Sequence, residues 1–313
     1  MKNVLFYLVT VLIWGSTWIG IKMQLGTIDP LISVAYRFSL AALLLMCWCR
    51  FRHLSMRFSL AEHGFMALQG LLLFGFNYLL FYIAELHVTS GLAAVIFSTI
   101  LVMNMVNGAI FLKSSIDGRV IIGGMLGLSG IVLVFRPELS SYSLENDGVI
   151  GVFYCLLATL LASLGNITSA RNQKRGLPIV QTNAFGMGYG ALAMYLVLFS
   201  AGKPLAFDVS AVYIGSLIYL ALFGSVIAFG CYLTLVGNIG ADRAAYATLL
   251  FPIVALLIST VWEDYLWTVS SATGVMIILL GNLWMLKRHP DVSRRPGLFH
   301  SLLQVLKINP DRS

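Results

Sequence analysis

Long apolar runs follow one another along almost the whole chain, and they constrain the fold more than any other feature. Each run is close to the roughly 20 residues that a helix needs to cross a bilayer. Only 11% of the 313 residues are charged, against about 25% in a soluble domain. The sequence therefore predicts an all-α polytopic membrane protein with ten transmembrane helices. The expected spans lie near residues 4–22, 31–49, 64–84, 88–112, 119–136, 148–170, 179–200, 211–235, 242–262 and 268–286.

Two of the apolar stretches need a turn inside them. Residues 64–112 are almost continuously apolar. As one helix they would reach roughly 70 Å, more than twice the thickness of a bilayer core. The polar segment 85–91 is the best place for a turn, and the same argument divides 211–262 at residues 237–242.

The lysines and arginines lie mostly between the spans, and their distribution predicts the orientation. If the N-terminus is cytoplasmic, sixteen of the twenty fall in cytoplasmic segments, three fall outside and Arg37 lies within a span. Cytoplasmic loops of membrane proteins carry such an excess. We expect a multi-pass protein of the inner or plasma membrane with both termini in the cytoplasm. Residues 287–313 would form a basic cytoplasmic tail, either disordered or containing a short amphipathic surface helix.

The second half of the chain repeats features of the first at offsets of 149 to 151 residues. Because each half holds five spans, an odd number, the halves must enter the membrane in opposite senses. Residues 1–140 and 141–286 are therefore predicted to be two inverted five-helix repeats, an arrangement typical of alternating-access transporters. The matches include Trp14-Gly15 with Leu164-Gly165, Phe74-Gly75 with Phe223-Gly224, Gly123 with Gly274, and Gly130 with Gly281.

The sequence offers no catalytic or metal-binding pattern. It has no HExxH, GxSxG or P-loop spacing, its five histidines are scattered, and its four cysteines lie in apolar segments without a CxxC pair. A membrane enzyme would gather His, Asp or Glu at one membrane face. We expect a protein that is not an enzyme and that holds no cofactor and no metal. Because the basic residues lie between apolar runs, the net charge of +7 indicates the membrane surface rather than nucleic acid.

Arg37 is the charged residue that most needs an explanation. An arginine at depth in a bilayer costs at least about 2.5–3.5 kcal/mol on insertion scales. We interpret it as a cation that faces a cavity, where it binds a substrate carboxylate or phosphate or acts as a gate. The alternatives are an ion pair with Glu85 or Asp29, or snorkelling to the interface. Glu85 is expected to partner a cation rather than carry a proton, and Lys22 to anchor the first span at the interface.

Uncharged polar and aromatic residues inside the spans complete the candidate set. Asn104 shares a helix face with Asn107, three positions later. Asn166 in the same way shares a face with Ser163. Such residues could line a hydrophilic cavity, or join helices by hydrogen bonds worth about 0.6 kcal/mol each. The aromatic residues could form an apolar cavity wall. With Arg37, the candidate substrate-binding or gating residues are Trp14, Tyr82, Asn104, Asn166 and Tyr232.

Short motifs in several spans form a recognisable series. They are Trp14-Gly-Ser-Thr-Trp18, Pro30, Arg37-Phe-Ser-Leu-Ala-Ala42, Pro252 and Glu263. Their order over residues 3–286 resembles the EamA-type branch of the drug/metabolite transporter superfamily. The resemblance implies ten helices, inverted repeats, and a central cavity surrounded by helices 1, 3, 4, 6, 8 and 9. The first half departs from the pattern, because Leu101 stands at the family's proline position and Leu112-Lys113 where its glutamate is expected.

The residues and the resemblance together indicate a secondary transporter. We expect it to export amino acids or related small metabolites by alternating access. The first alternative is a carrier for phosphorylated or nucleotide-linked sugars, which would need several cations in its cavity. The others are a non-transporting integral-membrane enzyme or a scaffold. The expected partners are a small-molecule metabolite and the lipid bilayer, and the sequence leaves a homo-oligomer open.

Overall fold

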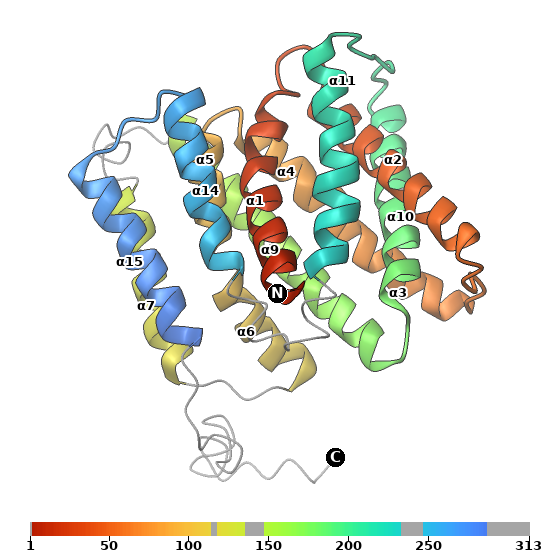
Figure 1. Ribbon diagram of the computed structural model, residues 1–313, viewed down its shortest axis with the longest axis horizontal. Coiled ribbons are helices and arrows are strands. Elements are labelled where there is room, and N and C mark those ends of the chain that lie inside the picture. The colour runs from red at the N-terminus through yellow and green to blue at the C-terminus, as the bar shows by residue number, and fades with distance from the viewer. Residues whose placement is uncertain (1, 114–117, 135–146, 233–246, 287–313) are drawn as a thin grey trace.

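The computed structural model describes residues 2–113, 118–134, 147–232 and 247–286, and every regular element in these ranges is helical. The helices form one bundle, with α7 and α15 side by side at one edge of it (Figure 1). The elements are α1 (Lys2–Lys22), α2 (Pro30–Phe51), α3 (Leu60–Gly70), η1 (Leu71–Gly75), α4 (Phe76–Ala84), α5 (Ser90–Phe97), α6 (Ile100–Leu112), α7 (Gly118–Val134), α9 (Asp147–Lys174), α10 (Ile179–Ser200), α11 (Ala211–Ile218), η2 (Tyr219–Ile227), α14 (Ala247–Trp262) and α15 (Val269–Leu286).

Seven continuous helical segments in the described ranges are long and apolar enough to cross a membrane. The expected spans at 119–136, 242–262 and 268–286 correspond to three shorter apolar helices, so the count of ten stays a prediction. The architecture is that of a multi-pass membrane protein. The seven segments are Lys2–Lys22, Pro30–Phe51, Leu60–Ala84, Ser90–Leu112, Gly148–Lys174, Ile179–Ser200 and Ala211–Tyr232.

The turn expected at residues 85–91 is confirmed, because α4 ends at Ala84 and α5 begins at Ser90. The Thr89 side chain caps α5 by accepting a hydrogen bond from the backbone N–H of Leu92. The turn expected at 237–242 and the tail 287–313 lie outside the described residues.

Polar caps and a proline fix where other helices begin. Asp29 accepts a hydrogen bond from the backbone N–H of Leu31 at 2.9 Å, and Pro30 occupies the first helical position of α2. Ser59 and Glu62 form a reciprocal capping box at the start of α3. These local signals fix the residues at which α2 and α3 begin.

Three long helices are irregular in the middle. The segments Leu60–Ala84 and Ala211–Tyr232 widen into the π-helices η1 and η2, which contain Phe74-Gly75 and Phe223-Gly224. Between α5 and α6 the chain turns at Ser98 and Thr99, whose hydroxyls donate to carbonyls three residues earlier. The first half thus interrupts this helix without a proline, while Pro252 lies inside the continuous helix α14.

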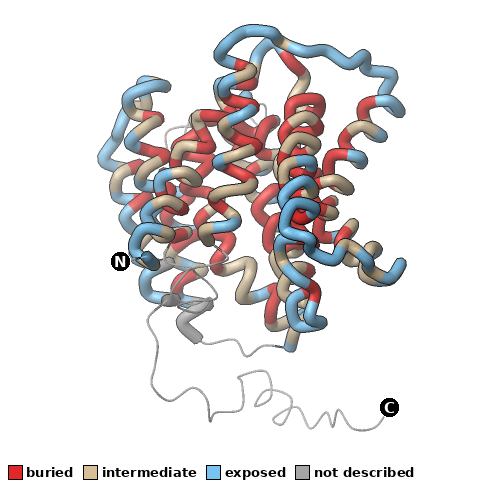
Figure 2. Tube along the Cα trace, turned by 45° about the vertical axis from the view of Figure 1, so that its right-hand side comes forward, coloured by how far each residue is buried: buried red, intermediate tan, exposed pale blue. Residues whose placement is uncertain are grey.

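Glycines allow close approach between helices from the two halves. A Cβ on Gly274 would lie 2.5 Å from the carbonyl oxygen of Gly130, and one on Gly281 would lie 2.9 Å from that of Gly123. α7 and α15 are therefore antiparallel and in backbone contact. Buried residues gather along the helix faces inside the bundle, while exposed residues mark its outside and its ends (Figure 2).

Candidate functional site

Arg37 lies in the interior of the bundle and is only 1% exposed. Its Nε donates a hydrogen bond to the hydroxyl of Ser225 in η2 at 3.3 Å. Its guanidinium carbon lies 4.4 Å from the ring centre of Tyr78 and 5.2 Å from that of Phe38. Its Nη1 atom has no hydrogen-bond partner in the described part of the chain. Arg37 thus keeps a free donor in a buried site with aromatic side chains around it.

A glycine in η2 makes room for this guanidinium. A Cβ on Gly224 would lie 3.4 Å from Nη2 of Arg37 and 2.7 Å from a methyl carbon of Thr17. The carbonyl oxygen of the same glycine accepts a hydrogen bond from the indole N–H of Trp14 at 3.4 Å. Two residues of η2 therefore position these side chains. The hydroxyl of Ser225 binds Arg37, and Gly224 leaves room for its guanidinium and binds Trp14 through its carbonyl oxygen.

Tyr82 is fully buried near Arg37. Its hydroxyl donates to the side-chain oxygen of Gln24 at 2.6 Å, and the guanidinium of Arg37 also interacts with it. The amide nitrogen of Gln24 has no partner among the described residues. Tyr82 therefore contacts both Gln24 and Arg37, and each of these residues has a side-chain nitrogen without a partner in the described part of the chain.

The ion pairs differ from both pairings considered for Arg37. Asp29 pairs with Lys203 rather than with Arg37. Lys203 lies in the loop after α10. Glu85 forms no ion pair with Arg37 within 4.0 Å in the described residues, and neither of its carboxylate oxygens has a hydrogen-bond partner there. The prediction that Glu85 partners a cation is wrong for this arrangement of the side chains.

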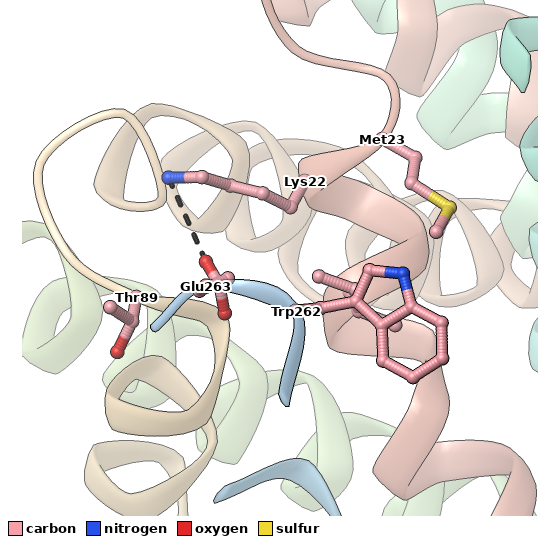
Figure 3. A pocket seen from close by; sticks show the side chains of 6 residues that line it. Lys22, Met23, Thr89, Trp262 and Glu263 are labelled. Carbon is pink, nitrogen blue, oxygen red and sulfur yellow. Dashed lines mark ion pairs between the residues drawn. The ribbon is translucent and has the colours of Figure 1, made fainter. Parts of the chain in front are cut away.

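Lys22 belongs to a charged cluster at the end of α1, and its role as an interfacial anchor stays a prediction. Its Nζ lies 4.0 Å from a carboxylate oxygen of Glu263 and also donates to the backbone carbonyl of Glu85. Glu263 in turn accepts from the backbone N–H and the hydroxyl of Ser90. Lys22 and Glu263 point toward each other across a pocket of about 470 Å³, which Thr89 also lines (Figure 3).

Trp14 and Tyr232 meet in an aromatic group away from the charged cluster. Their ring centres are 5.0 Å apart, and the ring of Trp14 also lies 5.3 Å from Phe229 and 6.4 Å from Phe251. This group joins α1 to the segment that follows η2 and to α14. It is linked to the Arg37 site through the hydrogen bond from Trp14 to Gly224.

Asn104 and Asn166 face each other between α6 and α9. The side-chain amide of Asn166 donates to the oxygen of Asn104 at 3.5 Å, and Asn107 donates to the hydroxyl of Ser163 at 2.8 Å. Both are helix-joining bonds, and both asparagines of the first pair stay partly exposed. The structure thus brings Arg37, Tyr82, Trp14 and Tyr232 into one connected region and places this asparagine pair in another.

Sequence reasoning missed several residues that hold these sites together. Gln24 and Ser225 contact Tyr82 and Arg37 from distant parts of the chain. A buried amide network also joins α3, α9 and α10: Gln69 donates to Asn183 at 3.0 Å and accepts from Asn172 at 3.1 Å. The available signal was a polar residue within an apolar run. This signal marks a residue that needs a hydrogen-bond partner, but it does not indicate which residue the partner is. In the described ranges, no group of three or more His, Cys, Asp or Glu side chains could hold a metal ion.

Comparison with known proteins places this geometry in a family context. The profile of the EamA-like transporter family matches residues 1–136 and 149–287. Protein PagO of Salmonella typhimurium strain LT2 is 25% identical over 280 residues, which cover 89% of each chain. A protein of Escherichia coli K12 named "uncharacterized inner membrane transporter YedA" is 28% identical over 80% of this chain and 79% of its own length. A solved crystal structure covering 90% of this chain and 95% of its own shares the fold, with a TM-score of 0.65 and 15% identity.

Proposed function

Because the chain belongs to the EamA-like transporter family, we propose that this membrane transporter exports amino acids or related small metabolites by alternating access, with Arg37 as its substrate-binding or gating cation. Relatives named as transporters point to a protein that is not an enzyme. The observation that carries the proposal is the buried guanidinium of Arg37, which has a free Nη1 and no ion pair in the described residues.

The chemistry of this site favours an anionic group on the substrate. Buried donors are nearly always satisfied, so a free guanidinium N–H marks a place where a ligand or water is expected. An arginine binds a carboxylate through charge-assisted hydrogen bonds, which are about twice as strong as neutral ones. Gln24 offers a second free amide donor beside Tyr82. A carboxylate fits this small donor set better than a phosphate, which would need several cations.

Two features support the proposal that residues 1–140 and 141–286 are inverted repeats. The π-helices η1 and η2 contain the matched pairs Phe74-Gly75 and Phe223-Gly224. The glycine contacts between α7 and α15 are also reciprocal, because exchanging the halves turns the contact of Gly130 with Gly274 into that of Gly281 with Gly123. A two-fold relation between halves that cross the membrane in opposite senses would produce this pattern.

We further propose a cytoplasmic location for both termini and an inner or plasma membrane location for the protein. The proposal follows the excess of lysine and arginine on one side. In this orientation the charged cluster of Lys22, Glu85 and Glu263 would lie at the outer end of the bundle. The Gln69, Asn172 and Asn183 network would lie toward the cytoplasm.

The first test is a profile of extracellular metabolites from cells that overproduce the protein. Arg37→Ala and Arg52→Gln would be compared with the wild type at matched membrane levels, since Arg52 is exposed and serves as the control. We expect one class of carboxylate-bearing metabolites to accumulate outside cells with the wild type and the control. Arg37→Ala should reduce export about tenfold or more, because a buried charged hydrogen bond contributes about 1.5–3 kcal/mol.

Three other outcomes have definite meanings. Equal export by Arg37→Ala would make Arg37 a structural residue. Accumulation of phosphorylated sugars would favour the alternative carrier. No accumulation with any variant would contradict export and favour uptake or a scaffold role.

A further inference from the structure

Glu85 is the buried acid whose environment the transport site does not explain. It follows the last residue of α4, just outside the spanning segment Leu60–Ala84, and it is fully buried. Both of its carboxylate oxygens lack a hydrogen-bond partner in the described residues, as does the nearby Nη1 of Arg37. An ionised carboxylate buried in this way would lose its hydration without compensation.

The charged and titratable groups that face Glu85 come from every element around it. Lys22 lies on α1, Arg37 on α2, Cys155 on α9 and Glu263 at the end of α14, while Tyr82 precedes Glu85 on α4. Both cations bind other groups. Lys22 contacts Glu263 and the backbone carbonyl of Glu85, and Arg37 contacts Ser225 and Tyr82.

The two acids of the cluster differ in how they are satisfied. Glu263 accepts hydrogen bonds from Ser90 and lies beside Lys22. Glu85 has none of these contacts, and a second negative charge nearby disfavours its ionisation further. Burial, and then the charge of Glu263, raise the pKa of Glu85 well above its usual value against the opposing effect of Lys22 and Arg37.

A pocket lies beside this cluster. The pocket of about 470 Å³ is lined by Lys22, Thr89 and Glu263, and the side chain of Lys22 is 36% exposed. Lys22, which lines the pocket (Figure 3), also donates to the backbone carbonyl of Glu85. Rotation of the lysine ammonium from the Glu85 carbonyl to its carboxylate would favour the ionised form.

We propose that Glu85 is a proton-binding site that couples proton movement to transport. Its carboxylate takes up one proton from water in the pocket to become a carboxylic acid, and returns that proton when Lys22 or Arg37 pairs with it in another arrangement of the bundle. The coupling rests on the proposed transport function, while the binding of the proton does not.

Infrared spectroscopy of the purified full-length protein in liposomes tests proton binding directly. The difference spectrum between wild type and Glu85→Gln at pH 7 should contain the carbonyl stretch of a protonated carboxylic acid. The matched difference for Glu263→Gln is the control for the other acid of the cluster. Glutamine has the shape of protonated glutamic acid, so Glu85→Gln should fold, and its thermal unfolding is the check. A carboxylate-only difference for Glu85→Gln would overturn the proton site.

Transport in the same liposomes tests the coupling. The probe is the metabolite that accumulates in the extracellular profile, moved with and without an imposed pH difference. We expect the pH difference to change the wild-type rate several-fold and to leave the rate of Glu85→Gln unchanged. An equal response of both would overturn the coupling and leave the transport function standing. If no metabolite is transported, the proposed function fails, and the infrared difference still decides whether Glu85 binds a proton.

Discussion

At the scale of the residue, the contacts of Arg37 explain how the bundle tolerates a buried cation without an acid. Insertion of the charge costs at least about 2.5–3.5 kcal/mol. A desolvated cation–π contact contributes about 2 kcal/mol, and a hydrogen bond to a charged group about 1.5–3 kcal/mol. The ring of Tyr78 and the hydroxyl of Ser225 can therefore offset most of the insertion cost. The Nη1 group, which has no partner in the described part of the chain, remains available to a ligand.

The same contacts predict that lysine cannot replace Arg37. A lysine would keep the charge but lose the planar fork, and with it simultaneous contact with Ser225, Tyr78 and a carboxylate. We expect Arg37→Lys to export at a rate close to that of Arg37→Ala, measured as extracellular metabolite per unit of membrane protein. Wild-type export by Arg37→Lys would mean that the charge alone suffices.

Glu85 predicts how stability depends on pH. The raised pKa means that the folded protein holds a proton that the unfolded chain has released, at every pH between the ordinary glutamate value and the raised one. The free energy of unfolding should then fall as the pH rises through this interval, by about 1.4 kcal/mol for each unit of pKa shift.

Glu85→Gln has no carboxyl group to ionise, so this part of the pH dependence should disappear. The measurement is thermal unfolding of both proteins in detergent from pH 5 to pH 9, with Asp264→Asn as the exposed control. Parallel curves for the wild type and Glu85→Gln would contradict a raised pKa.

At the scale of the element, the sequence predicted where helices lie better than where they become irregular. Hydropathy and the thickness of the bilayer predicted where the spans lie, and the polar segment from Glu85 to Gly91 predicted a turn. The interruption at Ser98 and Thr99 carries no proline or glycine, and its signal is two hydroxyls that compete for backbone carbonyls. The π-helices depend on packing against distant segments. Ser225 contacts a residue 188 positions earlier, which no local pattern encodes.

The contact between α7 and α15 predicts opposite effects for two glycines of these helices. Gly274→Ala would place a methyl group 2.5 Å from the carbonyl oxygen of Gly130, so the helices must move apart at a cost of about 1–3 kcal/mol. Gly127→Ala meets no atom within 4 Å and should be neutral or slightly stabilising. Thermal unfolding in one detergent compares the two. Equal unfolding temperatures would contradict close backbone contact.

At the scale of the whole molecule, the pairing of elements from both halves is the feature that the repeat hypothesis explains. The sequence predicted the two halves from matched glycines, and those glycines lie at the α7–α15 contact. It did not predict which spans touch, because a single sequence holds no distances between spans. The candidate residues were accordingly found one by one. Arg37 and Tyr82 proved to be neighbours, whereas Asn104 and Asn166 form a separate pair.

Opposite insertion of the halves predicts which loops face the cytoplasm. In a chain whose four cysteines are replaced by serine, Ser115→Cys lies between the fourth and fifth expected spans, and Leu266→Cys lies between α14 and α15, where Leu266 is 83% exposed. An impermeant thiol reagent added to intact cells should label Leu266→Cys only, and Ser115→Cys should react after the cells are opened. Labelling of both from the same side would contradict inverted repeats.

The position of Glu85 directly after the last turn of α4 has an electrical consequence. Moving one charge across the whole membrane is worth about 2.3 kcal/mol per 100 mV. A proton that reaches Glu85 through the adjacent pocket crosses only a small part of that voltage, since the residue lies at an end of the bundle. Occupancy of this carboxyl by protons should therefore follow the acidity of the adjoining solution and respond little to the membrane potential.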